Sequence, residues 1–598
     1  MKCIQVLPIL KHTFSEELTY WTPHTFSIGD LIVVTLNKRK IYAIVSSVLS
    51  LSEAKEFIKS SDFKIKKIEE YEKIDFFSNE FIKSCIYTSK YFIRSFGEIL
   101  SEYIPKSVLE ELSEQSTPNR LPVSKEKHIP IYVQKEFGEQ IQYAEELLKI
   151  DTDIVIVVPT DSYKKHISQS LATEKVTIIT PIDLYKLDVL KVDVCILAFV
   201  GSEYYRHLRK KFDVRVTVRH YCELRNVQLV EMDSVLPLYT HVEIQDITSP
   251  FSNTPQIYVV DQSVSGGAKV SKKNVVPKPE DEADIRVIME QQIDVVSHKK
   301  LKLLSPELYS LIAHAEKTKD DVFIYTTRKG LSTSVTCSDC GHVLACTICK
   351  KPFSLKDVKG ARTFVCPQGH TPPPTDTPCP ICGNPHLQLL GSATDALREE
   401  LEGIIAMPVV IVDGDHMTQA GARTIFKKRK DKDHVPTIYI GTELALHQGV
   451  QEKFTYTGIA SLETLLALPT RIAELEAIRV IEAMREKTLH TLVIQTRHIE
   501  HVVWKSVQEK TWSTLLMQIR NDTKTLGLPP FKTHVQIQIS NKKDYATVRT
   551  FLQKYMHVDA TDNTLHIHTS DWPLDPLYRY LKSVPEYIHI EVDSPSLM

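Results

Sequence analysis

Seven of the eleven cysteines lie between Cys337 and Cys382, and six of these seven form CxxC pairs. This spacing lets two thiolates reach one tetrahedral zinc ion from a tight turn. The segment is rich in proline and poor in apolar residues, so its core is too small to hold it together without metal. The cysteines therefore predict a zinc-binding insertion over residues 337–385.

The seventh cysteine, Cys366, is followed by His370 in the stretch CPQGH. Two zinc ions need eight ligands, and the cluster supplies eight candidates: Cys337, Cys340, Cys346, Cys349, Cys366, His370, Cys379 and Cys382. His370 either completes this set or is a solvated loop histidine with water at the eighth position. The cysteines outside the cluster stand singly in apolar surroundings, so we expect them to be small core residues.

The N-terminus lacks the charged segment followed by a long apolar run that marks a secretory signal peptide. No apolar run of about 18 residues, the length of a membrane-spanning helix, occurs in the chain. We therefore expect a soluble cytoplasmic protein that does not contact membranes. A reducing compartment also favours zinc over a disulfide framework. The net charge of -2 neither indicates nor excludes a polyanionic partner.

The chain divides by pattern into an α/β multidomain protein. Residues 1–105 are β-rich, with DLIVVTL and KIYAIVSSV flanking the turn NKRK as a hairpin and YFIRSFGEILSEYIP expected to be helical. Residues 106–127 read as a linker or a truncated winged-helix region. Residues 128–261 alternate apolar strands such as DIVIVVPT and DVCILAFV with helices, which predicts a parallel sheet covered on both faces.

A polar stretch at 262–284 is expected to be a linker. A second α/β unit is predicted over 285–527, with the strands DVFIYTT, MPVVIVDGD, TIYIGTE and LHTLVIQT, and the zinc insertion follows the first of them. Residues 528–598 alternate strand and helix patterns and predict a small α+β domain.

This arrangement resembles the primosomal protein N′ family, the replication-restart helicases called PriA. The resemblance is carried in order by LTYWTP, GDLIVVTLNKRKIYAIVSSV, TTRKGLSTSVTCSDCG, GSATDALREEL, IYIGTELALHQG, LGLPPFKTHVQIQI and IHIEVDSPS. It implies two RecA-like helicase lobes and a front module for the 3′ end of a DNA strand. It also implies that one zinc ion is held by Cys337, Cys340, Cys379 and Cys382 and the other by Cys346, Cys349, Cys366 and His370.

The chain departs from that family at the sites that would use ATP. A P-loop cradles phosphates with backbone N–H groups and a lysine, and a hydroxyl holds Mg²⁺. Here Glu139 and Gln140 follow Gly138 at the corresponding place, and no GxxxxGK[ST] occurs anywhere in the sequence.

Two further elements of the family's nucleotide site differ. The strand that would end in a DEEH-type acidic pair ends in Ala198, Phe199, Val200 and Gly201, and the arginine-pair stretch reads RVIEAMREK, which keeps at most Arg485. We therefore expect neither an ATP nor a magnesium cofactor, and no catalytic residue.

The resemblance assigns DNA binding to residues of the front module: Leu18, Thr19, Tyr20, Asn37, Lys38, Arg39 and Lys66. Aromatic rings beside lysines suit base stacking and phosphate pairing. The alternative is that Tyr20 and Trp21 are core residues and the lysines a solvated face. Other basic runs, KKRKDK at 427–432, RHLRKK at 206–211 and SKK at 271–273, are either DNA contacts or solvated surface.

Three functions are therefore open. The first is a zinc-containing scaffold that recognises forked or 3′-ended DNA in replication restart, repair and recombination without hydrolysing ATP. Its expected partners are DNA, a single-strand-binding protein and a primosome or helicase loader, and it is expected to be a monomer. The second is a working ATP-dependent 3′-to-5′ helicase with a divergent site. The third is a zinc-stabilised protein-interaction module.

The zinc assignment predicts about two zinc ions per chain in carefully prepared protein, measured by metal analysis. The His370 site should lose its metal first on acidification, because imidazole must be neutral to ligate. His370→Ala should lower the count toward one. A wild-type count below about 1.5 would contradict the role of His370.

Overall fold

The computed structural model describes residues 2–9, 18–36, 39–49, 66–68, 74–75, 77–105, 107–108, 127–149, 152–171, 173–207, 211–238, 255–261, 303–327, 335–337, 344, 354–358, 361–365, 374, 377–385, 387–389, 393–414, 416–431, 433–449, 452–466, 472–496, 499–509, 511–539, 541–561, 563–585 and 587–594. Contacts divide the chain into two compact units, which are Met1–Gln245 with Ile519–Pro595 and Asp246–Gln518 with Ser596–Met598. The predicted linker at 262–284 lies outside the described residues, and of the predicted linker or winged-helix region at 106–127 only residues 107, 108 and 127 are described.

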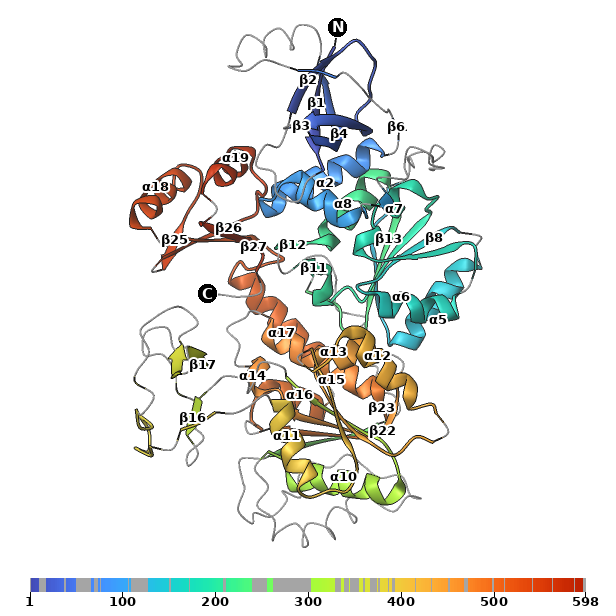
Figure 1. The fold of residues 1–598 in the computed structure, drawn as a ribbon, viewed down its shortest axis with the longest axis vertical. Helices are drawn as coiled ribbons and strands as arrows, with labels where there is room; N and C mark the ends of the chain where they lie inside the picture. The colour runs from blue at the N-terminus through green and yellow to red at the C-terminus, as the bar shows by residue number, and fades with distance from the viewer. Residues whose placement is uncertain are drawn as a thin grey trace. The chain divides into compact units, whose positions relative to one another are not determined.

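The first unit begins with a largely antiparallel sheet whose described strands run in the order β5-β2-β1-β4-β3-β6 (Figure 1). The strands are β1 (Lys2–Pro8), β2 (Leu18–Thr22), β3 (Asp30–Leu36), β4 (Arg39–Leu49), β5 (Lys66–Lys67) and β6 (Ile74–Asp75). The predicted hairpin is confirmed, because β3 and β4 pair antiparallel with Leu36 opposite Arg39, so β4 begins inside the stretch NKRK. One face carries a small core that includes Ile4 and Val34, and Leu7 and Leu31 face the helices that follow.

Two helices follow where we expected one helical stretch at 91–105. Helix α2 (Asn79–Phe92) ends at Ile93, whose φ of 53° is left-handed and stops the helix. Helix α3 (Phe96–Tyr103) then begins with a capping box between Ser95 and Glu98. The prediction was wrong about the boundary because apolar residues continue across a turn that only the caps mark.

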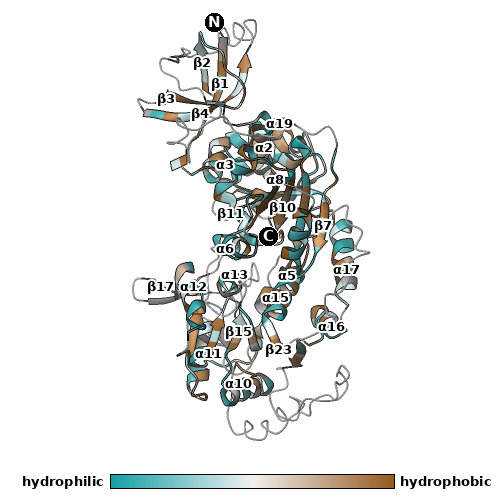
Figure 2. Cartoon of the chain, turned by 90° about the vertical axis from the view of Figure 1, so that its right-hand side faces the viewer, coloured by the Kyte–Doolittle hydropathy of each residue, from teal (hydrophilic) through white to brown (hydrophobic). Residues whose placement is uncertain are grey.

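A parallel sheet forms the centre of the first unit, with its described strands in the order β7-β13-β10-β8-β9. The strands are β7 (Ile131–Gln134), β8 (Ile154–Val157), β9 (Val176–Ile179), β10 (Val194–Ala198) and β13 (Gln228–Asp233). Every residue of β8 and β10 is buried, as expected when helices cover both faces, and Figure 2 shows β10 as hydrophobic. The predicted parallel sheet is confirmed.

The elements between these strands are short. They are α5 (Phe137–Leu148), α6 (Asp161–Ser170), η2 (Pro181–Asp183), α7 (Lys186–Val189), η3 (Glu203–Tyr205), β11 (Arg206–His207), β12 (Phe212–Asp213) and α8 (Val214–Arg225). Strands β11 and β12 pair with each other as a small hairpin outside the parallel sheet.

Helix α2 joins three parts of the first unit. At its start, Ser78 donates from its backbone N and its Oγ to the buried carboxylate of Asp188, at 2.7 and 2.5 Å. Along the helix, Thr88 Oγ1 lies 2.7 Å from Thr217 Oγ1 of α8, and at its end Tyr91 Oη donates to Asp593 at 2.5 Å. A deletion of residues 1–105 would therefore remove part of the core of the first unit.

The last described stretch of the first unit is a four-element antiparallel sheet with two helices. Its strands β24 (Thr533–Gln538), β25 (Asp559–Thr561), β26 (Thr564–Thr569) and β27 (His589–Val592) run in the order β25-β26-β24-β27. The helices are α18 (Lys542–Leu552) and α19 (Asp575–Ser583). The chain order β-α-β-β-α-β with this strand order is that of a ferredoxin-like fold. Its apolar residues join the core that also holds Phe81 and Tyr103.

The second unit contains a parallel sheet whose described strands run β14-β23-β22-β15-β21-β20. They are β14 (Gln256–Asp261), β15 (Val322–Thr326), β20 (Val409–Val412), β21 (Ile438–Gly441), β22 (Phe454–Ser461) and β23 (Thr488–Thr496). We expected residues 256–261 to end the first lobe, and this was wrong, because β14 pairs in parallel with β23. An apolar strand pattern does not reveal which of two sheets an edge strand joins.

The helices of this part are α10 (Pro306–Thr318), α11 (Ala393–Glu402), α12 (Gln419–Lys428), α13 (Glu443–Gln448), α14 (Glu463–Leu466), α15 (Ala473–Lys487), α16 (Val502–Glu509) and α17 (Trp512–Thr525). Within the predicted insertion, β16 (Val335–Cys337) pairs with β19 (Leu387–Leu389), and β17 (Ser354–Val358) pairs with β18 (Ala361–Val365). Of the helices whose residues are described, none is long and apolar enough to span a bilayer.

Candidate nucleic-acid interface and nucleotide face

The predicted DNA-binding residues on β2 divide between the two faces of the strand. Tyr20 is buried in the small core of the N-terminal sheet, and its hydroxyl donates to the Thr35 carbonyl at 3.4 Å. Leu18 packs against the same core, and Thr19 is half-buried. Tyr20 therefore supports the sheet from inside, as the alternative reading of the sequence proposed.

The other predicted contacts are described only in part. Asn37 and Lys38 lie outside the described residues, and only the backbone of Arg39 and Lys66 is described. Lys66 pairs in parallel with Tyr20, and the next residue on each strand, Lys67 and Trp21, pair in the same way.

Trp21 and Lys67 meet at this edge of the sheet. The Lys67 Nζ lies 5.3 Å from the centroid of the Trp21 ring, within the distance of a cation–π contact. Lys67 is exposed and Trp21 is half-buried. The sequence contains both residues, but only the two-residue strand β5 brings them together.

The segment between β7 and α5, where a P-loop would hold phosphates, is short and leads directly into the helix. Strand β7 ends at Gln134 and α5 begins at Phe137, so Gly138 and Glu139 lie in the first turn of a helix. A Cβ on Gly138 would meet nothing within 4 Å, so no close approach requires glycine there. The Gln140 backbone N donates to Glu136 O at 2.9 Å, and its side chain donates to Lys135 O at 2.8 Å. The backbone N–H and the side-chain amide of Gln140 therefore both donate to acceptors within the protein.

Aromatic rings gather around this helix start. The Phe137 ring stacks on Phe199 with centroids 5.5 Å apart, and Phe199 lies 4.1 Å from the ring of Tyr163. Phe199 directly follows β10 and has a left-handed φ of 53°. We call Phe137, Tyr163 and Phe199 the aromatic cluster.

The end of β10 is bonded to neighbouring elements. The buried hydroxyl of Tyr205 lies 2.7 Å from Ala198 O and 2.8 Å from Val157 O and donates to these carbonyls at two strand ends. The Val200 backbone N donates to Met232 O at 3.1 Å. Burial raises the pKa of Tyr205 well above its usual range, so the hydroxyl stays protonated as a donor.

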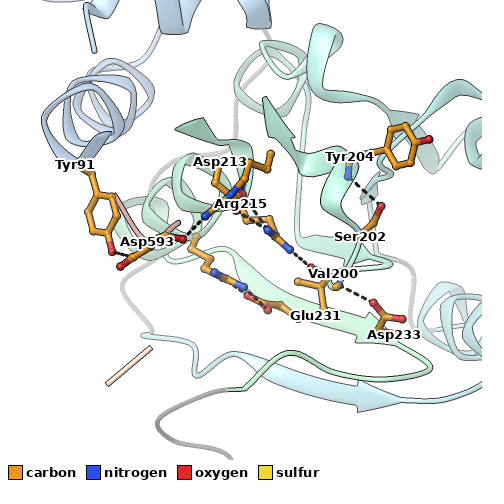
Figure 3. Close-up of polar contacts among 12 residues, drawn as sticks. Tyr91, Val200, Ser202, Tyr204, Asp213, Arg215, Glu231, Asp233 and Asp593 are labelled. Atoms are coloured by element: carbon orange, nitrogen blue, oxygen red, sulfur yellow. Dashed lines mark hydrogen bonds and ion pairs between the residues drawn. The ribbon is translucent and has the colours of Figure 1, made fainter. Parts of the chain in front are cut away.

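Carboxylates near this edge are paired within the protein (Figure 3). Asp233, at the end of β13, accepts a hydrogen bond from the Gly201 backbone N at 2.6 Å. Glu231 is buried and accepts from Arg219 at 2.6 and 2.9 Å. Arg215 bridges Asp213 and the Val200 carbonyl, donating at 2.5 Å to each.

The pKa of Asp213 reflects this pairing. Burial alone would raise it, but the charge and hydrogen bonds of Arg215 more than offset burial and lower the pKa of Asp213 to about 2. Asp213 is therefore a structural carboxylate that is ionised at neutral pH.

In the second unit, Arg485 is the remaining candidate for the arginine pair. It lies in α15, is buried, and donates through Nε to Glu482 at 2.8 Å. A guanidinium held in this way within its own helix has a partner for its charge already.

The basic runs serve largely structural roles where their side chains are described. Arg206 donates to the Asp593 carbonyl at 2.5 Å and Lys211 pairs with Glu591. Arg429 pairs with Asp321 at 2.8 Å and Glu452 at 3.0 Å. Lys427, Lys428 and Lys430 are exposed, and SKK at 271–273 lies outside the described residues.

Part of the predicted zinc site is described. Cys379 and Cys382 lie in a tight turn, in which Gly383 N donates to Cys379 O at 2.9 Å and Gly383 has a φ of 71°. The β16–β19 ribbon pairs the backbone of Cys337 with Leu387, close in sequence after this turn. Among the described residues no group of three or more metal-ligating side chains occurs, and only Cys379 and Cys382 of the eight predicted ligands have described side chains.

Comparisons with known proteins converge on one family. Residues 6–105 match the family model of the PriA 3′DNA-binding domain. The replication restart protein PriA of Haemophilus influenzae is 23% identical over 236 residues, which are 38% of this chain and 32% of that protein. The PriA proteins of Synechocystis and Bacillus subtilis are 22% and 23% identical over 38% and 40% of this chain and 28% and 30% of their own length.

The chain is similar to PriA proteins, and its residues 6–105 match their 3′DNA-binding domain. It spans about a third of the length of the curated PriA proteins it matches. A solved structure of Saccharomyces cerevisiae Dbp5 bound to RNA and ADP BeF3 is 11% identical, covers 74% of this chain and 98% of its own, and has a TM-score of 0.28. At that score the likeness carries no argument.

The residues that replace the family's nucleotide motifs could be read from the sequence, but their contacts in the fold could not. Phe137 precedes the substituted loop and Phe199 is one of the substituted strand-end residues, so their aromatic character was the available signal. Asp233 and Tyr205 gave no local signal, because their partners are distant in sequence.

The Asp213–Arg215 pair predicts a specific acid sensitivity. Its contribution is complete above the unfolded pKa of 3.8 and is lost as pH falls toward the folded pKa of about 2, which amounts to about 2 kcal/mol. Asp213→Asn should remove that part of the pH dependence, measured by denaturant unfolding between pH 5 and 2.

The matched control is Asp575→Asn, which breaks an exposed pair with Lys90 and should change unfolding by less than about 1 kcal/mol. If Asp213→Asn retained the wild-type loss of stability in acid, the buried pair would not be its source.

Proposed function

We propose that this PriA relative binds DNA with a single-stranded or forked 3′ end in replication restart, and that it does so without ATP-driven unwinding. The match of residues 6–105 to a 3′DNA-binding domain supports the DNA-binding part. The altered edge of the first parallel sheet supports the part about ATP.

The aromatic cluster is the single observation on which the loss of ATP use rests. A triphosphate needs backbone N–H donors, a cation and a metal ligand at the carboxyl ends of the strands. Phe137, Tyr163 and Phe199 offer apolar rings there instead. Glu139, exposed in the first turn of α5, adds a negative charge that favours the helix start and disfavours phosphate.

A second argument is that the phosphate-binding loop, the metal ligands and the arginine pair are all altered. Catalysis of phosphoryl transfer needs phosphate grip, metal and charge neutralisation at once, and each contributes orders of magnitude in rate. Here Gln140 is bonded to Lys135, the backbone after β10 is bonded to Asp233, and Arg485 is bonded to Glu482. Restoring one part would leave the other two missing.

We also propose that the insertion over residues 337–385 binds zinc. The turn at Cys379–Cys382 and the ribbon that carries Cys337 support one site with the ligands Cys337, Cys340, Cys379 and Cys382, and a second site would use Cys346, Cys349, Cys366 and His370. Zinc would supply the folding energy that this small segment lacks. A single-strand-binding protein and a helicase loader are the proposed protein partners.

The test measures DNA binding and ATP turnover in one preparation. We expect a 3′-tailed fork to bind with an affinity that falls linearly in log salt concentration, because phosphates are neutralised. The same fork should stimulate ATP turnover to no more than about 0.1 per second, below the usual enzyme range of about 1 to 1000 per second.

Glu139→Lys is the matched variant, because it restores one cation and leaves the strand end of β10 without a metal ligand. It should remain inactive. Fork-stimulated ATP turnover above that rate in the wild type would indicate an active helicase. Fork binding without salt dependence would favour a protein-interaction module.

A further inference from the structure

The contact between Trp21 and Lys67 lies on a polar part of the N-terminal sheet. Along β2, Tyr20 points into the small core, so Trp21 and Thr19 lie on the opposite face. On that face Thr19 is in register with Gln5, and Gln5 with Ser47. The Ser47 hydroxyl donates to the Gln5 side chain at 2.5 Å. The residue directly opposite Trp21 on β1 is the buried Cys3, and this polar row lies two residues along on the same face.

The position of β2 leaves this ring accessible. Helices α2 and α3 pack against the same face of the sheet through Leu7 of β1, Leu31 of β3 and Ile44 of β4. Both views show β2 at the other end of the module from α2 (Figures 1 and 2). Trp21 is half-buried, and the core that Leu7, Leu31 and Ile44 form with these helices contains no described residue of β2.

We propose that Trp21 and Lys67 form a stacking site for one unpaired base and its phosphate in single-stranded DNA. This inference rests on the proposed function and assigns part of DNA binding to residues other than Leu18, Tyr20 and Lys66. An aromatic face stacks on any base, and an adjacent ammonium neutralises the phosphate that follows it. Charge complementarity selects a polyanion with exposed bases over an apolar partner.

Binding a base at this site requires only that the Lys67 ammonium leave the Trp21 ring. In the free protein the Lys67 ammonium lies over the indole, and such an exposed contact is weaker than the stacking of a base on an aromatic ring. Lysine has a flexible four-carbon stem, so Lys67 can move from the ring to a phosphate while a base takes its place. No backbone movement is needed.

The competing explanation is structural. Strand β5 consists of Lys66 and Lys67 and pairs only with β2, so the cation–π contact could serve merely to hold this edge strand in place. In that case loss of Trp21 or Lys67 would lower stability and leave the affinity for DNA unchanged. The two roles therefore predict different results from the same variants.

The experiment uses the full chain and a short oligothymidine, with binding followed by fluorescence anisotropy across a salt series. Trp21→Ala should weaken binding at least about fivefold, and Trp21→Phe should retain most of it. Lys67→Met should lower the slope of log affinity against log salt by about 0.7, the value for one phosphate of a single strand. Lys554→Met, which removes a similar exposed lysine from the Phe551 ring, should change neither quantity.

Intrinsic fluorescence gives an independent reading. The other tryptophans are Trp504 and Trp512, which are buried, and Trp572, whose indole N–H donates to Tyr91 O. Oligothymidine should therefore quench the wild-type emission, and Trp21→Phe should bind without quenching. Unchanged affinity in Trp21→Ala, or an unchanged quench in Trp21→Phe, overturns the stacking site. If the wild type binds neither a fork nor oligothymidine, the proposed function itself is wrong.

Discussion

A buried carboxylate, Asp188, ties the N-terminal module to the first parallel sheet. It accepts both polar hydrogens of Ser78 at the start of α2 and the hydroxyl of Tyr221 at 3.1 Å. A charge buried this deeply is tolerated only when such donors surround it. At the other end of α2, Tyr91 binds Asp593 of the C-terminal stretch. The N-terminal module, the first sheet and the C-terminal sheet therefore lie in one compact unit, joined by α2 and by the contacts of Arg206 and Lys211 with the C-terminal stretch.

Under the proposed function, that unit explains why the first parallel sheet would persist without ATP hydrolysis. In open parallel sheets ligands bind at the carboxyl ends of the strands. Here those ends are bonded to the protein itself: Tyr205 binds two strand-end carbonyls, Asp233 binds Gly201 N, and aromatic rings cover the start of α5. The edge that would hold a nucleotide contributes instead to the stability of the frame that carries the DNA-binding module.

The sequence predicted individual strands better than it predicted which strands pair with each other. The β3–β4 hairpin and the apolar strands β8 and β10 follow from local patterns, and these were confirmed. Strand β14 was assigned to the wrong sheet, because its apolar pattern fits either one. At the candidate site, the substitutions at Glu139, Gln140 and Phe199 could be read directly. The contact of Trp21 with Lys67 depends on the pairing of a two-residue strand, for which no sequence pattern exists.

The central claim is that the altered sheet edge does not hold a nucleotide. Calorimetric titration of the full chain with Mg·ATP, with and without a saturating 3′-tailed fork, tests it most directly. We expect no saturable heat up to about 1 mM nucleotide, where binding free energy would be only about -4 kcal/mol. A stoichiometric transition with a Kd in the micromolar range, about -8 kcal/mol, would contradict it.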